Sequence, residues 1–313
     1  MYRFLGFICL MLWALDLSGQ EPLSRYLRDG ARRDHYISIP FQLIDGIAVT
    51  FLTLNGHPHQ LFLVDTGSTD TLISKEAADI FHIPLILDSH SEFAASGKDV
   101  VSGKIAKKVR IDSGRFGIYS GPAPAISLSE LTSYFAQPVV GILGFNVIRA
   151  HPTVIDFVSG TIGIFMPDAF EPRNSMNRIV LESCLRSPII NAEIQVGSTE
   201  YLSANLMIDT GTQVPLELYR PYVGKERLLK QDGLRQLELE GVGGRHLTSH
   251  GLAGSLRINN RKIKLTDVYL SQTSGGITDD TNVDGALGIP VLKDSQLVIN
   301  CNEKYAIINE ASN

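Results

Sequence analysis

The residues best suited to chemistry are two aspartates that occur in the same short motif. Asp65-Thr66-Gly67 recurs as Asp209-Thr210-Gly211, and the two aspartates are 144 residues apart (209 − 65). An apolar run precedes each Asp, and a hydroxyl residue follows each Gly, Ser68 in the first copy and Thr212 in the second. Because burying a lone carboxylate is costly, an Asp that ends an apolar strand is expected to accept hydrogen bonds from a tight turn or from the hydroxyl.

Two such loops facing each other would make a hydrolytic site. Carboxyls about 3 Å apart cannot both ionise, so they share one proton. One carboxyl can then act as a general base on a water molecule, while its protonated partner donates to the carbonyl under attack. This chemistry cleaves an amide without a metal or a covalent intermediate, and the titration belongs to the pair rather than to Asp65 or Asp209 alone.

Further motifs repeat at the same spacing. Gly141-Ile142-Leu143-Gly144 matches Gly285-Ala286-Leu287-Gly288, and Val154-Ile155-Asp156 matches Val298-Ile299-Asn300. Several motifs in one register predict an internal repeat and therefore two homologous domains. The predicted organisation is a signal peptide at 1–19, a basic stretch at 20–35, a first domain at 36–167, a linker at 168–177 and a second domain at 178–313.

The elements between these motifs are expected to be mostly strands. Runs rich in Val, Ile, Phe and Thr alternate with Gly, Asn, Asp and Pro, which is typical of strands and hairpins. Helical patterning is confined to 75–81 and to 127–135, where Ser127 and Glu130 fit a capping pattern, while 228–237 is ambiguous. The predicted fold class is therefore mainly β. The clearest predicted strands are 47–54, 61–64, 109–111, 153–158 and 161–165.

The two Asp-Thr-Gly regions resemble those of the pepsin-like and retropepsin-like aspartic proteases. The resemblance rests on 62–69 and 206–212, together with the downstream Ile142-Leu143-Gly144 and Ala286-Leu287-Gly288. It implies two homologous retropepsin-like β-barrel lobes with a cleft between them, in a compact fused pair of the kind found in bacterial secreted proteins. It also implies an endopeptidase that cuts extended peptides, usually between apolar residues.

The same resemblance implies roles for individual residues. Asp65 and Asp209 would be the catalytic pair, and Thr66 and Thr210 would join the two loops through reciprocal hydrogen bonds. The hydroxyl residues would orient the carboxylates. The supporting residues are thus Thr66, Gly67, Ser68, Thr210, Gly211 and Thr212. The segment Gln213-Val214-Pro215 departs from the family pattern, which puts the geometry beside Asp209 in question.

A flap hairpin is expected in each half. Segment 92–103 lacks the Tyr that pepsin-like enzymes carry on their flap, and its aromatic residue is Phe93. Segment 241–251 is rich in glycine and resembles a retropepsin flap. The flap candidates are Phe93, Gly97, Gly243 and Gly244.

The first residues have the pattern of a secretory signal peptide. A positive start is followed by the apolar run 4–15, which is short for a hydrocarbon layer of about 30 Å. We expect a secreted or periplasmic protein with no membrane contact after cleavage. The alternative is an uncleaved anchor on a cell-surface interaction protein, which would retain Trp13.

Two features of the mature chain remain open at this stage. Cys184 and Cys301 could pair in an oxidising compartment or stay as buried thiols. A basic stretch before the first strand could be a short propeptide for an acidic cleft or a solvated tail. Its arginines are Arg25, Arg28, Arg32 and Arg33.

Other functional classes find little support. The net charge of −5 gives no basic field for nucleic acid. No metal site is expected, because the chain has no CxxC pair and His246 and His250 lack the Glu of an HExxH motif. We expect an aspartic endopeptidase that acts as a monomer on a peptide or protein substrate without a cofactor. The alternative is a catalytically inactive, peptide-binding module of the same fold.

Overall fold

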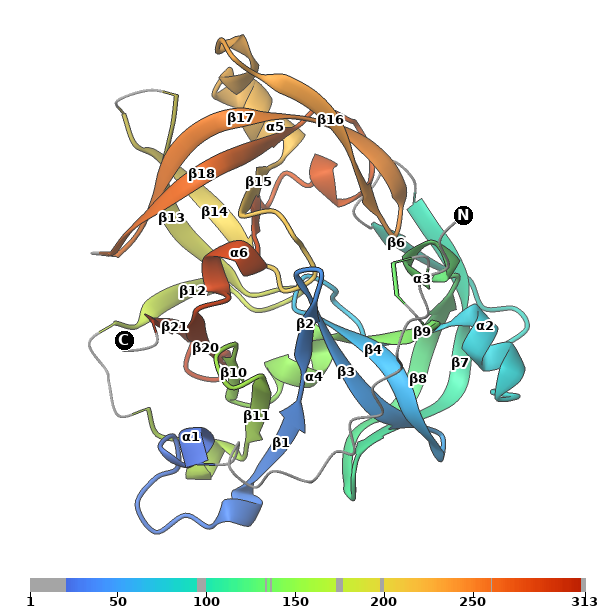
Figure 1. Cartoon of the computed structure of the whole chain (residues 1–313). Helices are drawn as coiled ribbons and strands as arrows, with labels where there is room; N and C mark the ends of the chain where they lie inside the picture. The colour runs from blue at the N-terminus through green and yellow to red at the C-terminus, as the bar shows by residue number, and fades with distance from the viewer. Residues whose placement is uncertain are drawn as a thin grey trace, which may run out of the picture.

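The computed structural model describes residues 21–94, 100–132, 134–135, 137–172, 177–197, 200–259 and 261–310. The predicted signal peptide, the flap candidate Gly97 and residues 173–176 of the predicted linker lie outside this set. The described part is mainly β, as the sequence pattern predicted (Figure 1). Below, residues 36–167 are called the first half and residues 178–313 the second half.

The first half builds all of an eight-stranded sheet. The order across the sheet is β2 (Gln42–Ile44), β3 (Ile47–Leu54), β4 (His57–Asp65), β9 (Val139–Gly144), β5 (Leu72–Ser74), β8 (Phe116–Ile126), β7 (Val100–Ser113) and β6 (Ser91–Ala94). The six strands from β3 to β7 in this order close into a barrel, because β3 also pairs with β7.

Local sequence explains how this sheet begins. In β3 most side chains are buried, as expected for a strand rich in Ile, Val and Leu. The turn from β3 to β4 is Asn55-Gly56, and both residues have positive φ (48° and 86°). Two residues with positive φ fit the tight hairpin turn whose twist matches the flanking strands. The strand that carries Asp65 is therefore the second arm of a local hairpin.

A thirteen-stranded sheet contains the remaining strands. Its second part also forms a ring of six strands, from β13 to β17, closed by an additional β13–β17 pairing. The order is β1 (Tyr36–Pro40), β11 (Thr161–Phe165), β10 (Thr153–Asp156), β20 (Ser295–Asn300), β21 (Tyr305–Glu310), β12 (Ile179–Ser183), β13 (Ile189–Val196), β14 (Leu202–Ile208), β19 (Gly285–Leu287), β15 (Leu216–Leu218), β18 (Arg261–Ser271), β17 (Gly244–Ile258) and β16 (Arg235–Gly241).

The two rings have the same strand order. Reading β3-β4-β9-β5-β8-β7 in the first and β13-β14-β19-β15-β18-β17 in the second, each strand has one counterpart. The halves meet where β10 pairs with β20, and there Val154 lies opposite Val298, its repeat partner 144 residues later. The internal repeat seen in the sequence is therefore also a repeat of strand order.

Helices are short and lie between the strands. Ser74 caps α2 by accepting a hydrogen bond from the Ala77 N–H at 2.9 Å. The helix expected at 127–135 is only one turn long, and the ambiguous segment 228–237 divides into a short helix and the start of β16. The helices are α1 (Glu21–Ser24), α2 (Lys75–Ile80), α3 (Ser129–Thr132), α4 (Phe145–Arg149), α5 (Arg220–Lys225) and α6 (Ile289–Leu292), with 3₁₀ turns η2 (Arg33–His35), η3 (Pro167–Ala169), η4 (Leu228–Lys230) and η5 (Gly276–Asp279).

The segment before the first strand is built into the fold rather than forming a solvated tail. Leu23 and Tyr26 are buried in an apolar cluster with Phe165 and Phe170. The Tyr26 hydroxyl donates to Gln296 at 2.7 Å. Apolar residues between the arginines therefore decide where this segment lies, and the beginning of the predicted linker is buried with them.

A disulfide joins Cys184 to Cys301 across 117 residues. Both half-cystines pack against the main hydrophobic cluster. Of the two possibilities left open by the sequence, the structure has the bonded one. The bond ties the end of β12 to the end of β20, the strand at the junction of the halves.

Candidate active site

The two aspartates sit at matching strand ends. Asp65 is the last residue of β4, and Asp209 directly follows β14. Each of these strands runs parallel to the strand of a downstream Gly motif, β9 in the first half and β19 in the second. In each half the buried side chains of these two parallel strands thus hold the Asp at the edge of a buried layer.

The loops after the aspartates are joined by four hydrogen bonds in which Thr66 and Thr210 take part. Each Thr side-chain oxygen accepts the other residue's backbone N–H at 3.0 Å. Each hydroxyl then donates to a carbonyl of the opposite strand, Thr66 to Ile208 at 2.7 Å and Thr210 to Val64 at 2.8 Å. Both threonines are fully buried, so this link holds the loops in one relative position.

The glycines of the two motifs bring the carboxyls together. A Cβ on Gly67 would lie 2.6 Å from Cγ of Asp209, and one on Gly211 would lie 2.5 Å from Cγ of Asp65. Any side chain at either glycine would therefore collide with the opposite carboxyl. Glycine is required here by the close approach, and the two carboxyls lie within hydrogen-bonding reach of each other.

Backbone donors orient the carboxyls. The N–H groups of Gly67 and Ser68 donate to Oδ1 of Asp65 at 2.8 and 3.0 Å. The N–H of Gly211 donates to Oδ1 of Asp209 at 2.8 Å. Each Asp is only half-buried as a residue, so part of it is reachable by water.

Both carboxyls are harder to ionise than usual. Burial raises the pKa of Asp65, and hydrogen bonds from Asp209, Ser68 and Gly67 offset part of that rise. Burial, together with the negative charge of Asp65, raises the pKa of Asp209 well above its usual 3.8. Two neighbouring carboxyls of raised pKa retain a shared proton to a higher pH than isolated aspartates do. The pair can therefore present one base and one acid at the same time.

The hydroxyl of Ser68 does not act as the sequence suggested. The Ser68 hydroxyl donates to the carbonyl of Asp70 at 2.9 Å, and it is the Ser68 N–H that reaches the carboxylate. Thr212 contributes its backbone carbonyl, which accepts the N–H of Ile289 at 3.2 Å. Local turn geometry favours the nearby carbonyl for Ser68, a preference that residue type alone does not reveal.

The downstream Gly motifs support the loops from behind. A Cβ on Gly144 would lie 2.3 Å from the Asp70 carbonyl oxygen, and one on Gly288 would lie 2.1 Å from that of Val214. In the first half Asn146 also accepts from both the N–H and the hydroxyl of Thr71, at 2.9 and 2.7 Å.

In the first half the Gly144 N–H donates to the Thr71 hydroxyl at 3.0 Å, and the second half has a different acceptor at this place. The Gly288 N–H donates to the Pro215 carbonyl at 3.1 Å. The departure at 213–215 therefore changes the support of the loop, while the Gly211 N–H reaches Asp209 at 2.8 Å, the same distance as from the Gly67 N–H to Asp65.

The two expected flap segments are hairpins. In the first, Phe93 of β6 pairs with Val101 of β7. In the second, Gly241 and Gly244 pair at the turn between β16 and β17, where Gly244 has φ of 85° and Gly243 is buried.

Each hairpin reaches the opposite half. Val242, at the tip of β16–β17, packs against an apolar cluster of the first half. Tyr134 of the first half donates to Glu240 at 2.7 Å. Strand β6 lies beside η5 of the second half.

A buried acid–imidazole pair beside the site was not anticipated. Oε1 of Glu217 and Nε2 of His246 are 2.8 Å apart, and both side chains are almost fully buried. Burial, with a contribution from the charge of Glu217, raises the pKa of Tyr219 well above its usual range. The available sequence signal was an acidic residue between two leucines in a short apolar strand.

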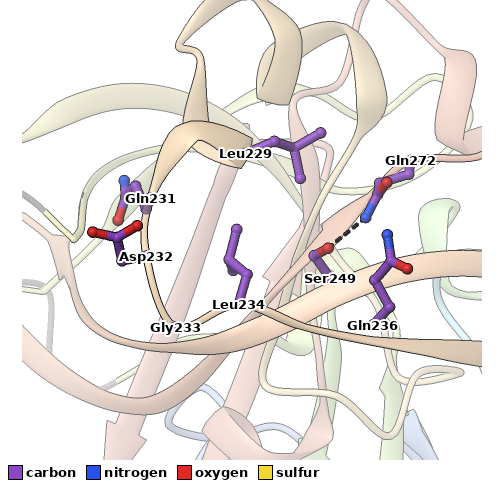
Figure 2. A pocket seen from close by; sticks show the side chains of 8 residues that line it. All are labelled: Leu229, Gln231, Asp232, Gly233, Leu234, Gln236, Ser249 and Gln272. Carbon is purple, nitrogen blue, oxygen red and sulfur yellow. Dashed lines mark hydrogen bonds between the residues drawn. The ribbon is translucent and has the colours of Figure 1, made fainter.

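One cavity of the described chain lies away from the aspartate loops. A cavity of about 560 Å³ lies between η4 and the strands β16 and β17, where Gln272 donates to Ser249 (Figure 2). None of its lining residues belongs to the aspartate loops. Among the described residues no group of three or more metal-ligating side chains occurs, and none of the described helices is long and apolar enough to cross a bilayer.

Comparison of the chain with protein-family models and with curated proteins gave no match. What the site can do is therefore argued from its geometry. Asp65 is held by two backbone donors and Asp209 by one, and each carboxyl lies against the glycine of the other loop. The two carboxyls form an acid–base pair that is partly accessible to solvent.

Proposed function

We propose that this chain is an aspartic endopeptidase of the retropepsin-like kind, with two β-barrel lobes and a cleft between them. The observation that carries the proposal is the reciprocal contact of the two Asp-Thr-Gly loops, in which Gly67 and Gly211 each lie against the opposite carboxyl. The matching strand orders of the two rings support the two-lobe arrangement.

The chemistry follows from the shared proton. A water molecule between the carboxyls gives its proton to the ionised one, and the protonated carboxyl donates to the peptide carbonyl. Attack of the water oxygen on the carbonyl carbon produces a tetrahedral intermediate. The proton taken from the water then passes from its carboxyl to the leaving nitrogen as the C–N bond breaks. This sequence uses Asp65 and Asp209 in complementary roles and needs no nucleophilic side chain.

Secretion or export to the periplasm completes the proposal. The disulfide between Cys184 and Cys301 supports an oxidising compartment. The substrate would be an extended peptide or protein segment, bound by one monomer, and a peptide must displace or lift the two hairpins to reach the carboxyls.

The experiment is peptide cleavage followed by mass spectrometry, using the purified mature protein and a mixed peptide library from about pH 3 to 7. Asp65→Asn and Asp209→Asn should each lower kcat/KM by at least about 10³-fold and leave the fold intact. The exposed Asp294→Asn is the matched control and should cut at the wild-type rate. Near-native cleavage by either dyad variant would refute the mechanism.

One observation favours a second candidate, a peptide-binding module without activity. Val242 packs into the apolar cluster of the first half, so this hairpin covers a surface that a substrate would use. A folded protein that binds library peptides at every pH and cuts none would support this second function.

A further inference from the structure

Each half has one strand face that carries its aspartate. Side chains at alternate positions of a strand point to the same side. Leu63 therefore shares a face with Asp65, and Met207 shares a face with Asp209. The residues between them point to the opposite side, into the main hydrophobic cluster, where Val64 and Ile208 are fully buried.

The face beside Asp65 is apolar. It forms one cluster that includes Leu63, Leu72, Ile126 and Ile142, with Val101 of the β6–β7 hairpin packed against it. We call this cluster the first-half face. Nothing in these side chains can donate or accept a hydrogen bond.

Strand register identifies the corresponding residues of the second half. Leu72 lies opposite Ile142 across β5 and β9, whereas Glu217 lies opposite Ala286 across β15 and β19. Since Ile142 and Ala286 are repeat partners, Glu217 occupies the place of Leu72, 145 residues later (217 − 72). Two further cross-strand pairs show the same offset of 145. The pair Ile73–Ala125 of β5 and β8 corresponds to Leu218–Leu270 of β15 and β18. The pair Lys104–Ala125 of β7 and β8 corresponds to Ser249–Leu270 of β17 and β18.

This offset exchanges two more apolar residues for polar ones. His246 takes the place of Val101 in the flap hairpin, and Ser271 takes the place of Ile126 at the end of the long strand. The second-half face beside Asp209 is therefore polar at three positions where the first-half face is apolar. The asymmetry is specific to these positions, because Met207 still replaces Leu63 with another apolar residue.

The polar positions are buried and incompletely paired. His246 contacts Glu217 through Nε2, and its Nδ1 has no hydrogen-bond partner among the described residues. Thr248 and Ser271 lie opposite each other on β17 and β18, and their hydroxyls likewise have no partner within the described part of the chain. Buried polar atoms are normally hydrogen-bonded, so three unpaired ones on a single face indicate a missing polar group.

The chemistry of the face indicates the kind of group. A neutral imidazole that donates Nε2–H to the carboxylate leaves Nδ1 as an acceptor. With the second oxygen of Glu217 the face then offers two acceptors and a negative charge, and the hydroxyls of Thr248 and Ser271 can each accept as well as donate. Glu217 lies close enough to the dyad to contribute to the raised pKa of Asp209. A group bound there would thus lie beside the reacting bond.

We propose that Glu217, His246 and Ser271 form a specificity site for a basic side chain of the substrate, next to Asp209, while the first-half face takes an apolar side chain. This inference rests on the proposed function, because it assigns a binding face of the protein to the substrate side chain on each side of the cleaved bond. An ammonium or guanidinium group would donate to Glu217 and to the unpaired acceptors. An apolar side chain would leave those buried atoms unpaired, which strongly disfavours it.

The test compares matched peptides that differ only in the two residues around the cut. One set has Leu on one side and Lys on the other, in both orders, and the control set replaces Lys with norleucine, which has no charge. In one of the two orders, kcat/KM should be at least about tenfold higher with Lys than with norleucine. Equal values in both orders would overturn the inference and leave the proposed function standing.

Variants connect the preference to these residues. Glu217→Leu/His246→Val installs the side chains of the first-half face and should reverse the preference toward norleucine. Glu217→Gln keeps the shape, removes the charge and should reduce the Lys preference about tenfold even if the double variant fails to fold. Glu238→Leu removes an exposed charge on the β16–β17 hairpin, which also carries His246; this variant is the control and should keep the preference for Lys. A Lys preference that survives Glu217→Gln unchanged would overturn the assignment.

Binding separates the two hypotheses if the protein cuts nothing. Calorimetry with peptides whose central amide is reduced measures recognition without chemistry. Tighter binding of the Lys peptide than of the norleucine peptide, lost in Glu217→Gln, would support the specificity site although the proposed activity had failed. Equal binding, or no binding of either peptide, would overturn it.

Discussion

Thr66 and Thr210 each accept the other's backbone N–H through the side-chain oxygen, at 3.0 Å in both directions. Each hydroxyl also donates to a carbonyl on the opposite strand, so a side chain from each half completes the backbone hydrogen bonding of the other. The aspartates adjoin these residues. The relative position of the carboxyls therefore depends on contacts that neither half can make alone.

Replacing Thr66 with valine should destabilise the protein. Thr66→Val keeps the volume but leaves the Thr210 N–H and the Ile208 carbonyl without a partner. Each unpaired buried group costs about 1–3 kcal/mol. Thr66→Ser retains the hydroxyl and is the control, which should lose much less. Chemical denaturation measures both, and equal unfolding free energies for Val and Ser would contradict the role assigned to the hydroxyl.

Adding one methyl group to the loop should disrupt the site. In Gly67→Ala the new Cβ would lie 2.6 Å from Cγ of Asp209, so the two loops must move apart. We expect kcat/KM to fall by about 10²-fold or more, as for other small misplacements of reacting groups. Gly224→Ala in α5, where a Cβ meets no atom within 4 Å, should leave the activity unchanged. Wild-type activity in Gly67→Ala would show that the close approach is not needed.

The raised pKa of Asp209 predicts how stability changes with pH. The pKa of this carboxyl is higher in the folded state than its unfolded value of 3.8, so the folded state favours the protonated form and protonation contributes to stability. That contribution is complete below pH 3.8 and is lost as the pH rises through the folded pKa. Asp209→Asn, which cannot ionise, should therefore gain in Tm relative to wild type as the pH rises.

The matching measurement is scanning calorimetry from about pH 3 to 8. The Tm difference between Asp209→Asn and wild type should be small near pH 3 and increase toward neutral pH. Asp294→Asn, at an exposed position, should show no such trend. A difference that is constant over the whole range would show that burial of the carboxyl does not govern its ionisation.

Breaking the disulfide should lower stability considerably. Its loop of 117 residues restricts the unfolded chain, and removal of a native disulfide typically costs about 2–5 kcal/mol. Cys184→Ala/Cys301→Ala should therefore unfold at lower denaturant concentration than the oxidised protein. Adding a thiol reductant should destabilise the wild type and have no effect on the double variant. If the reductant affects neither protein, the bond does not form in solution.

Much of the architecture could be predicted from the chain itself. Alternating apolar runs bounded by Gly and Asn predicted strands at the positions of β3 and β11, because local backbone preferences and burial act within a few residues. The repeated motif identified Asp65 and Asp209, since an Asp after an apolar strand is rare and two in one register are rarer still. The Gly of each motif was expected for a tight turn, but neither Gly67 nor Gly211 has a positive φ, and each is required by the close approach of the opposite carboxyl.

Other features depend on contacts between distant residues and emerged only in three dimensions. The donors to Asp65 are backbone N–H groups, because the Ser68 hydroxyl finds a nearer acceptor in Asp70. The pairing of Glu217 with His246, 29 residues apart, results from the closure of a ring of strands. Local patterns determine which strands form and which residues carry charge. Which charges meet depends on strand register across the closed sheet, and no local preference encodes it.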